Sequence, residues 1–537
     1  MSALIPPLEV IQSFESHDFS VFDFFLKRKA RLGSASMVEF EDQVLNWHDG
    51  GELVDKASSW LLSKGVKTGD RVGLMSYNHP STVVLFIACA KLGVIVVPCN
   101  PDFAVGEAKY IFQHAQVCAV ICSHEVQEKV TEATQDMATK PWMVINDSDR
   151  FTANPGLLEI WRTCASVEHK PQGNAESTCL IIYTSGTTGF PKGVMHSQRS
   201  YLLTAEAFVQ RMYLQPQDRI MCVLPLFHIN ALMYSMGGAM ACGGSLILIK
   251  KFSASQFWNQ AAKTKATEVN VIMSAAAILA RRPLSEYNPD HCIKKMFLAP
   301  LNQDLKDTFN SRFGVETLIE CYGMTEIPGV ISNPFLGPHK IGSMGMISAH
   351  PSPHIERPQV VILDDDGQEL PMGEVGEIAV RTPTLMQGYY KDPEQTQASF
   401  SNGWFLTGDL GYKDADDFYF FFTRKKDIIR RKGENLSGAE IDNAISSHPD
   451  VSECAAIGVP SELGDEEVLV AVVPRKDANP STKDIMDHAK IHLSALKLPR
   501  YIVMVDSLPH TGSMKIAKFK LKPATDLLRR ATDFSTL

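Results

Sequence analysis

At 537 residues the chain is too long for one ordinary domain, so a large body with one or two smaller lobes is expected. Hydrophobic residues make up 45% and charged residues 21% of the chain, which excludes global disorder and allows a sizeable core. The net charge of −9 argues against a nucleic-acid partner, because no broad excess of cations is available to balance a phosphate backbone.

The cysteines and the terminal segments indicate the compartment. The 11 cysteines are scattered through apolar stretches, which is typical of buried thiols in a reducing compartment. Cys118 and Cys122 lie in an apolar strand pattern, so a metal site is not expected there. The N-terminus lacks a signal-peptide pattern, the C-terminus is not a standard peroxisomal signal, and no apolar run reaches the ~18 residues that span a bilayer. A cytoplasmic protein without a transmembrane segment is predicted.

Strand and helix patterns alternate through the first part of the chain. Buried strands are predicted at Arg71–Met75, Val94–Pro98 and Ala115–Cys122, with an apolar helix at Ser81–Gly93. Strands separated by helical lengths predict parallel sheets that are covered by helices on both faces.

The pattern changes beyond residue 355. Val360–Leu363 and Gly376–Val380 are short strand patterns with turns close by, and they predict a small antiparallel barrel or sheet. A last block begins after the basic run that ends at Lys432. It has the pattern of a small α+β domain, with helices at Gly438–His448 and Ser481–Leu496 and strands at Ala455–Val459 and Val468–Val473.

The predicted fold class is therefore α/β with two domains. A large N-terminal domain, residues 1–425, holds two βαβ-type sheets and a β-barrel-like subdomain at 355–425. A small, mobile α+β C-terminal domain follows at 426–537.

The stretch from residue 181 to residue 193 carries the clearest chemistry. An apolar strand runs directly into hydroxyls and glycines and then into a lysine. Glycines let backbone N–H groups approach an anion, hydroxyls add donors, and lysine supplies a positive charge. The spacing differs from that of a Walker A loop, but it predicts a polyphosphate site. Its residues are Thr184, Ser185, Gly186, Thr187, Thr188, Gly189 and Lys192.

A second constellation follows an apolar strand pattern at residues 315–319. Tyr322 offers an aromatic face for a purine, Thr325 a hydroxyl, and Glu326 a carboxylate suited to Mg²⁺.

These motifs, in this order, resemble the adenylate-forming superfamily, which includes acyl-CoA synthetases, adenylation domains of peptide synthetases and beetle luciferases. The resemblance extends from about residue 20 to about residue 525. It implies that Tyr322 stacks on adenine, that Thr325 meets the phosphate, and that Glu326 holds Mg²⁺.

The resemblance also implies roles for residues toward the C-terminus. Asp409, in Trp404–Asp409, matches the aspartate that accepts hydrogen bonds from both ribose hydroxyls, and Arg424 matches the arginine that reaches the ribose or phosphate. Lys426 occupies the hinge position. Lys515 matches the catalytic lysine of the C-terminal domain, although Met514 stands where most members have glycine. Lys432 and Gly433 are expected at the channel for coenzyme A.

An acyl pocket is predicted from His228, Ala299, Cys321 and Ile327, with Met233 and Tyr234 as further wall candidates; each could instead belong to the core. The bulky run at residues 297–302, with residues 429–437, resembles crotonobetaine/carnitine–CoA ligases and implies a short or compact acid. A cationic group on that acid would need an aromatic face or a carboxylate. Phe227, Tyr234 and Glu320 are the candidates, and Glu320 could instead be a surface or strand-end residue.

The predicted function is an ATP-dependent acid–thiol ligase. It adenylates a carboxylic acid, releases pyrophosphate, and transfers the acyl group to coenzyme A with release of AMP. Lys515, Thr325 and Glu326 are the predicted catalytic residues, and ATP, Mg²⁺ and coenzyme A are the expected cofactors. Alternatives are an acyl-AMP ligase that loads a carrier-protein thiol in trans, a luciferase-like oxygenase, and a non-catalytic nucleotide-binding protein. Homo-oligomerisation stays open.

Overall fold

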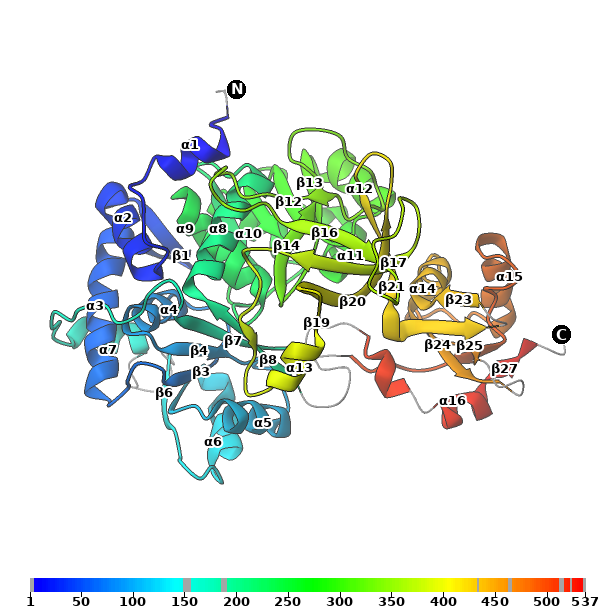
Figure 1. The fold of residues 1–537 in the computed structure, drawn as a ribbon, viewed down its shortest axis with the longest axis horizontal. Coiled ribbons are helices and arrows are strands. Elements are labelled where there is room, and N and C mark those ends of the chain that lie inside the picture. Colours follow the sequence, from blue (N-terminus) through cyan, green and yellow to red (C-terminus); the bar gives the residue numbers. More distant parts are fainter. Residues whose placement is uncertain are drawn as a thin grey trace. The chain divides into compact units, whose positions relative to one another are not determined.

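The computed structural model describes residues 4–147, 156–184, 191–431, 434–461, 466–510, 516–521 and 524–534 (Figure 1). These residues divide into two compact units, which we treat separately. The first unit contains the described residues up to 359 together with 380–400, and the second contains 360–379 and the described residues from 401 onward.

The described part of the first unit holds a seven-stranded sheet in the order β18-β8-β7-β4-β3-β5-β6. Its strands from β7 to β6 run parallel, whereas β8 pairs antiparallel with both β7 and β18. The strands are β3 (Arg71–Met75), β4 (Ile95–Pro98), β5 (Ala119–Cys122), β6 (Trp142–Ile145), β7 (Thr178–Thr184), β8 (Lys192–Ser197) and β18 (Gly388–Tyr389).

A nine-stranded sheet in the order β15-β14-β13-β12-β11-β9-β10-β1-β2 accompanies it among the described residues. Its strands from β13 to β1 are parallel, and both margins are antiparallel. The strands are β1 (Ser36–Phe40), β2 (Gln43–Asn46), β9 (Arg219–Cys222), β10 (Ser245–Leu248), β11 (Glu268–Asn270), β12 (Lys295–Leu298), β13 (Thr317–Met324), β14 (Ile327–Ser332) and β15 (Met346–Ile347).

Two helices contact both sheets. Helix α4 (Pro80–Leu92) packs against β4 and β1, and helix α8 (Gln198–Met212) packs against β8 and β14. Every residue of α4 is buried, which explains why it is apolar on all sides. Gly93 ends α4 in the left-handed region, with φ 66°.

The remaining helices of the first unit flank these sheets. They are α1 (Pro7–Gln12), α2 (Val21–Leu32), α3 (Trp47–Ser63), α5 (Val105–Ala115), α6 (Gln127–Thr134), α7 (Leu157–Thr163), α9 (Gly237–Cys242), α10 (Phe257–Thr264), α11 (Met273–Arg281), α12 (Gln303–Phe313), α13 (Pro393–Ala398), a π-helix at Asn230–Met236 and 3₁₀ turns at His124–Val126 and Leu284–Glu286.

The second unit begins with a five-stranded sheet, in which β16, β17, β20 and β19 are neighbours and β21 pairs with β20. A hairpin, a four-stranded sheet and three helices follow. The elements are β16 (Gln359–Leu363), β17 (Gly376–Arg381), β19 (Phe400–Ser401), β20 (Trp404–Lys413), β21 (Tyr419–Arg424), a 3₁₀ turn η4 (Lys425–Asp427), β22 (Ile428–Arg431), β23 (Glu434–Ser437), α14 (Gly438–Ser446), β24 (Val451–Pro460), β25 (Glu466–Pro474), α15 (Thr482–His492), β26 (Tyr501–Met504), η5 (Lys518–Leu521), α16 (Thr525–Arg530) and β27 (Thr532–Asp533).

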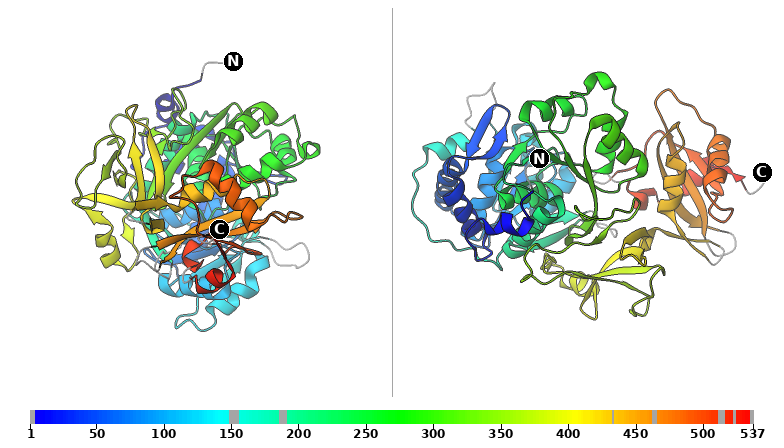
Figure 2. Two further views of the ribbon diagram at one scale, coloured as in Figure 1. Left: turned by 90° about the vertical axis from the view of Figure 1, so that its right-hand side faces the viewer. Right: turned by 90° about the horizontal axis from the view of Figure 1, so that it is seen from above.

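Strand β25 has apolar side chains on both faces. Val468 and Val470 join a cluster with Ile441 of α14 and Ile485 of α15, whereas Leu469 joins a second cluster. Because successive side chains of a strand point to opposite faces, the four-stranded sheet has two apolar faces, and helices cover each of them (Figure 2).

The predicted α/β class is confirmed, and β3 has the predicted bounds. The helix expected to reach Leu496 ends at His492, so that boundary was wrong. All eleven cysteines are free. In the described ranges, no helix combines the length and apolar character that crossing a membrane requires.

Candidate active site

The arms of the predicted phosphate loop are β7 and β8. Thr184 lies opposite Lys192 in their antiparallel ladder. Gly193 is tightly enclosed, because a Cβ there would lie 2.8 Å from Cγ2 of Ile181 and 3.2 Å from Cζ of Tyr183. The hairpin thus places Thr184 and Lys192 opposite each other where its two strands meet the loop. Ser185, Gly186, Thr187, Thr188 and Gly189 lie outside the described residues.

Tyr389 of β18 connects this hairpin to the predicted metal ligand. Its backbone pairs with Val194 of β8, and the ammonium of Lys192 lies 5.2 Å from the centre of its ring. The Tyr389 hydroxyl donates a hydrogen bond to Oε1 of Glu326 at 2.9 Å. Burial, and then the charge of Glu326, raises the pKa of Tyr389, so the phenol stays a donor. One side chain therefore contacts both a cation and a carboxylate.

His196 holds the backbone that carries Thr325 and Glu326. The ring is fully buried, with Nε2 2.7 Å from the carbonyl oxygen of Thr325 and Nδ1 3.1 Å from Oγ of Ser200. Burial lowers the pKa of His196 to about 4, so the imidazole is neutral. Because a carbonyl only accepts, Nε2 carries the proton. On the other side, the Met386 N–H donates to the Glu326 carbonyl at 2.9 Å.

The turn between β13 and β14 presents the remaining residues of this motif. Tyr322 pairs with Ile331, and a Cβ on Gly323 would lie 2.5 Å from the backbone nitrogen of Gly329. Tyr322 and Thr325 are half-buried, so both remain accessible to a ligand.

The two predicted ribose residues meet in the second unit. Asp409 of β20 and Arg424 of β21 are partners in an antiparallel ladder, and Arg424 Nε lies 3.3 Å from Oδ1 of Asp409. The expected hinge residue Lys426 lies in η4, directly after Lys425, whose ammonium pairs with Glu377 at 3.1 Å. Lys432, Gly433, Met514 and Lys515 lie outside the described residues.

The segment that carries His228 is positioned by Asn78. The Asn78 amide donates to the carbonyls of Leu224 and Ile249, both at 3.0 Å, and its Oδ1 accepts the Leu226 N–H at 2.8 Å. These bonds join the residues after β3 in one sheet to the residues after β9 and β10 in the other. His228 itself is half-buried.

The other predicted pocket residues lie on or directly after neighbouring strands: Ala299 follows β12, Cys321 lies on β13 and Ile327 on β14. Ala299 and Cys321 are half-buried, whereas Ile327 is fully buried. Tyr234 lies in the π-helix and is buried, with its ring stacked on Phe208 at 5.2 Å. A π-helix is rare and often marks a functional site.

Glu320 does not have the character of an exposed counter-ion. It is 4% exposed, and its Oε1 accepts the Leu301 N–H at 3.0 Å. Burial raises its pKa to about 8, so the carboxyl is mostly protonated near neutral pH.

Tyr389, His196 and Asn78 were missed in the sequence. His196 could have been found from its position, since it lies on the strand that directly follows the predicted phosphate loop. Tyr389 has none, because its contacts with Lys192 and Glu326 join segments that are distant in the chain.

Comparison with known proteins identifies the family. A model of AMP-binding enzymes matches residues 25–390, and a model of their C-terminal domain matches residues 440–515. Crotonobetaine/carnitine–CoA ligase of Salmonella typhimurium (strain LT2) is 30% identical over 481 residues, covering 88% of this chain and 92% of that protein. Sulfoacetate–CoA ligase of Cupriavidus necator is 32% identical over 462 residues, covering 85% and 88%.

Solved structures show the same fold. The anthranilate CoA ligase AuaEII in complex with anthranoyl-AMP has a TM-score of 0.85 and 25% identity, covering 96% of this chain and 99% of that chain. ATP-bound MatB from Rhodopseudomonas palustris has a TM-score of 0.84 at 24% identity, covering 95% and 99%. The resemblance of the motifs to adenylate-forming enzymes is confirmed, and the chain belongs to the AMP-binding enzyme family.

Proposed function

We propose that this enzyme adenylates a small carboxylic acid with ATP and transfers the acyl group to coenzyme A. It is an acyl-CoA synthetase, and the acid and the roles of individual residues are the finer part of the proposal. The observation that carries the proposal is the cluster of Lys192, Tyr389 and Glu326. The ammonium of Lys192 and the carboxylate of Glu326 both contact the phenol of Tyr389, beside the hairpin of the predicted phosphate loop.

The main barrier to adenylation is electrostatic, because a carboxylate must attack a phosphate that is itself an anion. Lys192 and the hydroxyl of Thr184 would stabilise the phosphate oxygens, and the Thr325 hydroxyl would bind the phosphoryl group as charge develops on it. His196 would hold Thr325 through its carbonyl, which leaves the threonine side chain available for the substrate. Tyr322 would stack on the adenine, and Asp409 with Arg424 would bind the ribose.

Glu326 suits Mg²⁺ by its chemistry, since Mg²⁺ is typically held by one or two carboxylates together with substrate phosphates. The Tyr389 hydroxyl orients the carboxylate through Oε1. Bound Mg²⁺ would neutralise charge on the phosphate oxygens.

Thioester formation requires that the residues which served adenylation be replaced, at the same site, by those which bind coenzyme A. Lys515 would serve adenylation, and rotation of a C-terminal domain (residues 426–537) about Lys426 would then bring Lys432 and Gly433 to coenzyme A. The free cysteines support a reducing compartment, and we place the enzyme in the cytoplasm.

The carboxylic acid substrate is proposed to have a short carbon chain. Two relatives are named for crotonobetaine or carnitine and for sulfoacetate, which are acids with few carbons. His228, Ala299, Cys321 and Ile327 would line the acyl pocket.

AMP release with a panel of short carboxylic acids, with and without coenzyme A, tests the proposal. We expect AMP release and thioester formation that both depend on the acid and on coenzyme A. Release of pyrophosphate with transfer only to a carrier-protein thiol would favour an acyl-AMP ligase, and no acid-dependent turnover of ATP would contradict the proposal.

A further inference from the structure

Arg211, in the last turn of α8, is a buried cation without an acidic partner. It is 3% exposed, and its Nε donates to Oγ of Ser348 at 2.9 Å. Its Nη1 is buried and has no hydrogen-bond partner, and Arg211 forms no ion pair within the described ranges. An uncompensated buried charge is costly, so such a group points to a partner that arrives from outside the chain.

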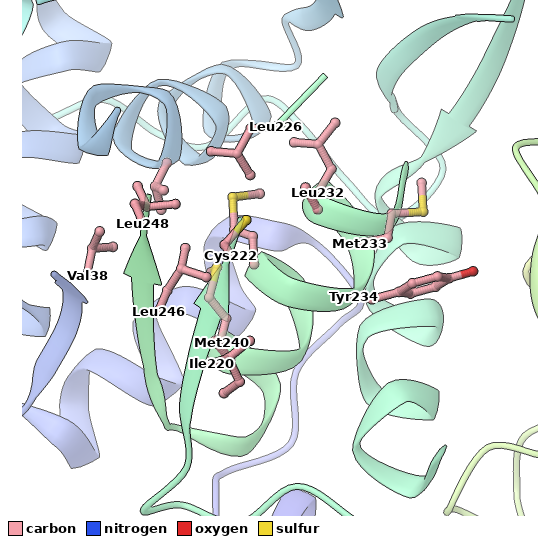
Figure 3. Packing of buried hydrophobic residues seen from close by; sticks show 14 of the residues in the cluster. Val38, Ile220, Cys222, Leu226, Leu232, Met233, Tyr234, Met240, Leu246 and Leu248 are labelled. Atoms are coloured by element: carbon pink, nitrogen blue, oxygen red, sulfur yellow. The ribbon is translucent and has the colours of Figure 1, made fainter. Parts of the chain in front are cut away.

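The guanidinium approaches two residues proposed for the wall of the acyl pocket, Tyr234 and Cys321. The guanidinium lies 5.8 Å from the centre of the Tyr234 ring, and the Cys321 side chain is nearby. A Cβ on Gly329 would collide with Nη1 where it now lies, so the glycine leaves room for the guanidinium there. Figure 3 shows Tyr234 at the edge of the packed aliphatic side chains, with its hydroxyl directed away from them.

The charge of this wall favours an anion over a cation. Tyr234 and Cys321 are neutral near pH 7, because burial raises the pKa of both groups. The nearby carboxyl of Glu320 is also mostly protonated under these conditions. Arg211 therefore gives the wall a net positive charge, which disfavours the cationic group that the sequence left as one option for the acid.

We propose that Arg211 is a specificity-determining residue that binds a second anionic group at the far end of the acid. A carboxylate or a sulfonate would satisfy the guanidinium, which binds both through paired N–H donors. The preferred substrate is then a short acid with an anion at each end. This inference rests on the proposed acyl-CoA synthetase activity.

The competing interpretation is purely structural. Arg211, Ser348, His350 and the exposed residue Glu356 line a cavity of about 10 Å³, which has room for one water molecule. A water could complete the hydrogen bonds of the guanidinium, but it would not neutralise the charge.

The wild-type enzyme gives the first test. We would measure kcat/KM for acyl-CoA formation with succinate, 3-sulfopropionate, succinamate and γ-butyrobetaine, and with the corresponding longer and shorter series. We expect kcat/KM for the acids with an anionic far end to exceed that for acids of equal length with a neutral or cationic far end by about 10²-fold. Comparison of succinate with 3-sulfopropionate distinguishes a preference for a carboxylate from a preference for a sulfonate. A neutral or cationic acid as the best substrate at every length would overturn the proposal, even without a variant.

Arg211→Gln gives the second test. We expect kcat/KM to fall by about 10²-fold for the dianionic acid and to change little for its neutral isostere, while Arg211→Lys retains part of the preference. Arg28→Gln is the matched control, because Arg28 is also buried but lies 3.6 Å from Glu206. It should cost stability without changing the ratio between the two acids.

The outcomes separate the two proposals. Equal losses for both acids in Arg211→Gln would assign Arg211 a structural role and overturn this inference alone. If Arg211→Gln does not fold, the ranking of acids by the wild-type enzyme still decides. Absence of thioester with every acid would overturn the proposed function itself.

Discussion

At the scale of single residues, Tyr389 connects the two charged side chains of the proposed site. It contacts Lys192 through its ring and Glu326 through its hydroxyl, so two separable interactions meet in one group. Because the hydroxyl orients the carboxylate, its loss should affect Glu326 while leaving the packing of the ring intact.

Tyr389→Phe should lower the rate of acyl-AMP formation by about 10–10²-fold and raise the Mg²⁺ concentration that gives half-maximal activity. Pyrophosphate release at varied Mg²⁺ measures both effects. Tyr412→Phe is the control, since that ring stacks on Phe420 at 4.9 Å in the second unit. An unchanged Mg²⁺ dependence would contradict the role given to the hydroxyl.

Glu268 of β11 makes the stability depend on pH. It is fully buried, and neither carboxylate oxygen has a hydrogen-bond partner within the described residues. Burial raises its pKa from 4.5 to about 8. Between these values the unfolded chain has released a proton that the folded protein keeps, so the free energy of unfolding falls as pH rises.

Glu268→Gln should therefore raise the Tm at pH 8 and bring no gain near pH 4.5, because the glutamine carries no charge to bury. Thermal unfolding across this range tests it. Glu316→Gln removes an exposed carboxylate that pairs with Lys294 at 2.9 Å, and should shift stability by less than about 1 kcal/mol. A Tm gain that does not depend on pH would contradict the explanation.

At the scale of elements, the turn η4 is the proposed pivot. It joins β21 to β22, and Lys425 at its start pairs with Glu377 at 3.1 Å and with Asp365 at 2.9 Å. These ion pairs fix the residue before Lys426, so rotation would be confined to a short segment.

Lys426→Pro should suppress acyl-CoA formation while acyl-AMP still accumulates, because proline restricts φ at the pivot. Separate measurement of acyl-AMP and acyl-CoA in one reaction detects this. Lys426→Ala keeps φ free and should leave both steps near normal. Normal overall turnover of the proline variant would place the pivot elsewhere.

Elements with local signals were predicted well from the sequence. Strand β3 and helix α4 follow from an apolar run and from the glycine that ends the helix. Arg211 could not be recognised as buried, because α8 packs between two sheets and loses the polar face by which a surface helix is read. Tyr389 was missed because β18 is two residues long and depends on pairing with β8, far earlier in the chain.

At the scale of the whole molecule, charge is unevenly distributed. The chain has a net charge of −9, yet both proposed nucleotide substrates are polyanions. A run of cations around the proposed pivot locally reverses the sign: Arg424, Lys425, Lys426, Arg430, Arg431 and Lys432. Local cations of this kind attract anionic substrates although the whole protein is acidic.

Lys515→Ala tests the division of labour between two conformations. Acyl-AMP formation should fall by about 10²–10³-fold, because one contact to developing charge is lost. Thioester synthesis from supplied acyl-adenylate and coenzyme A should persist. Lys520→Ala, an exposed neighbour in η5, is the control. Equal losses in both half-reactions would show that the lysine serves both.

The amide of Asn78 has a consequence for redesign. It holds the backbone of Leu224 and Leu226 from the opposite sheet through hydrogen bonds that involve no side chain of this segment. Phe227 and His228 can therefore be exchanged as a cassette while the main chain keeps its path. Asn78 is the position that an engineer of acyl specificity should leave untouched.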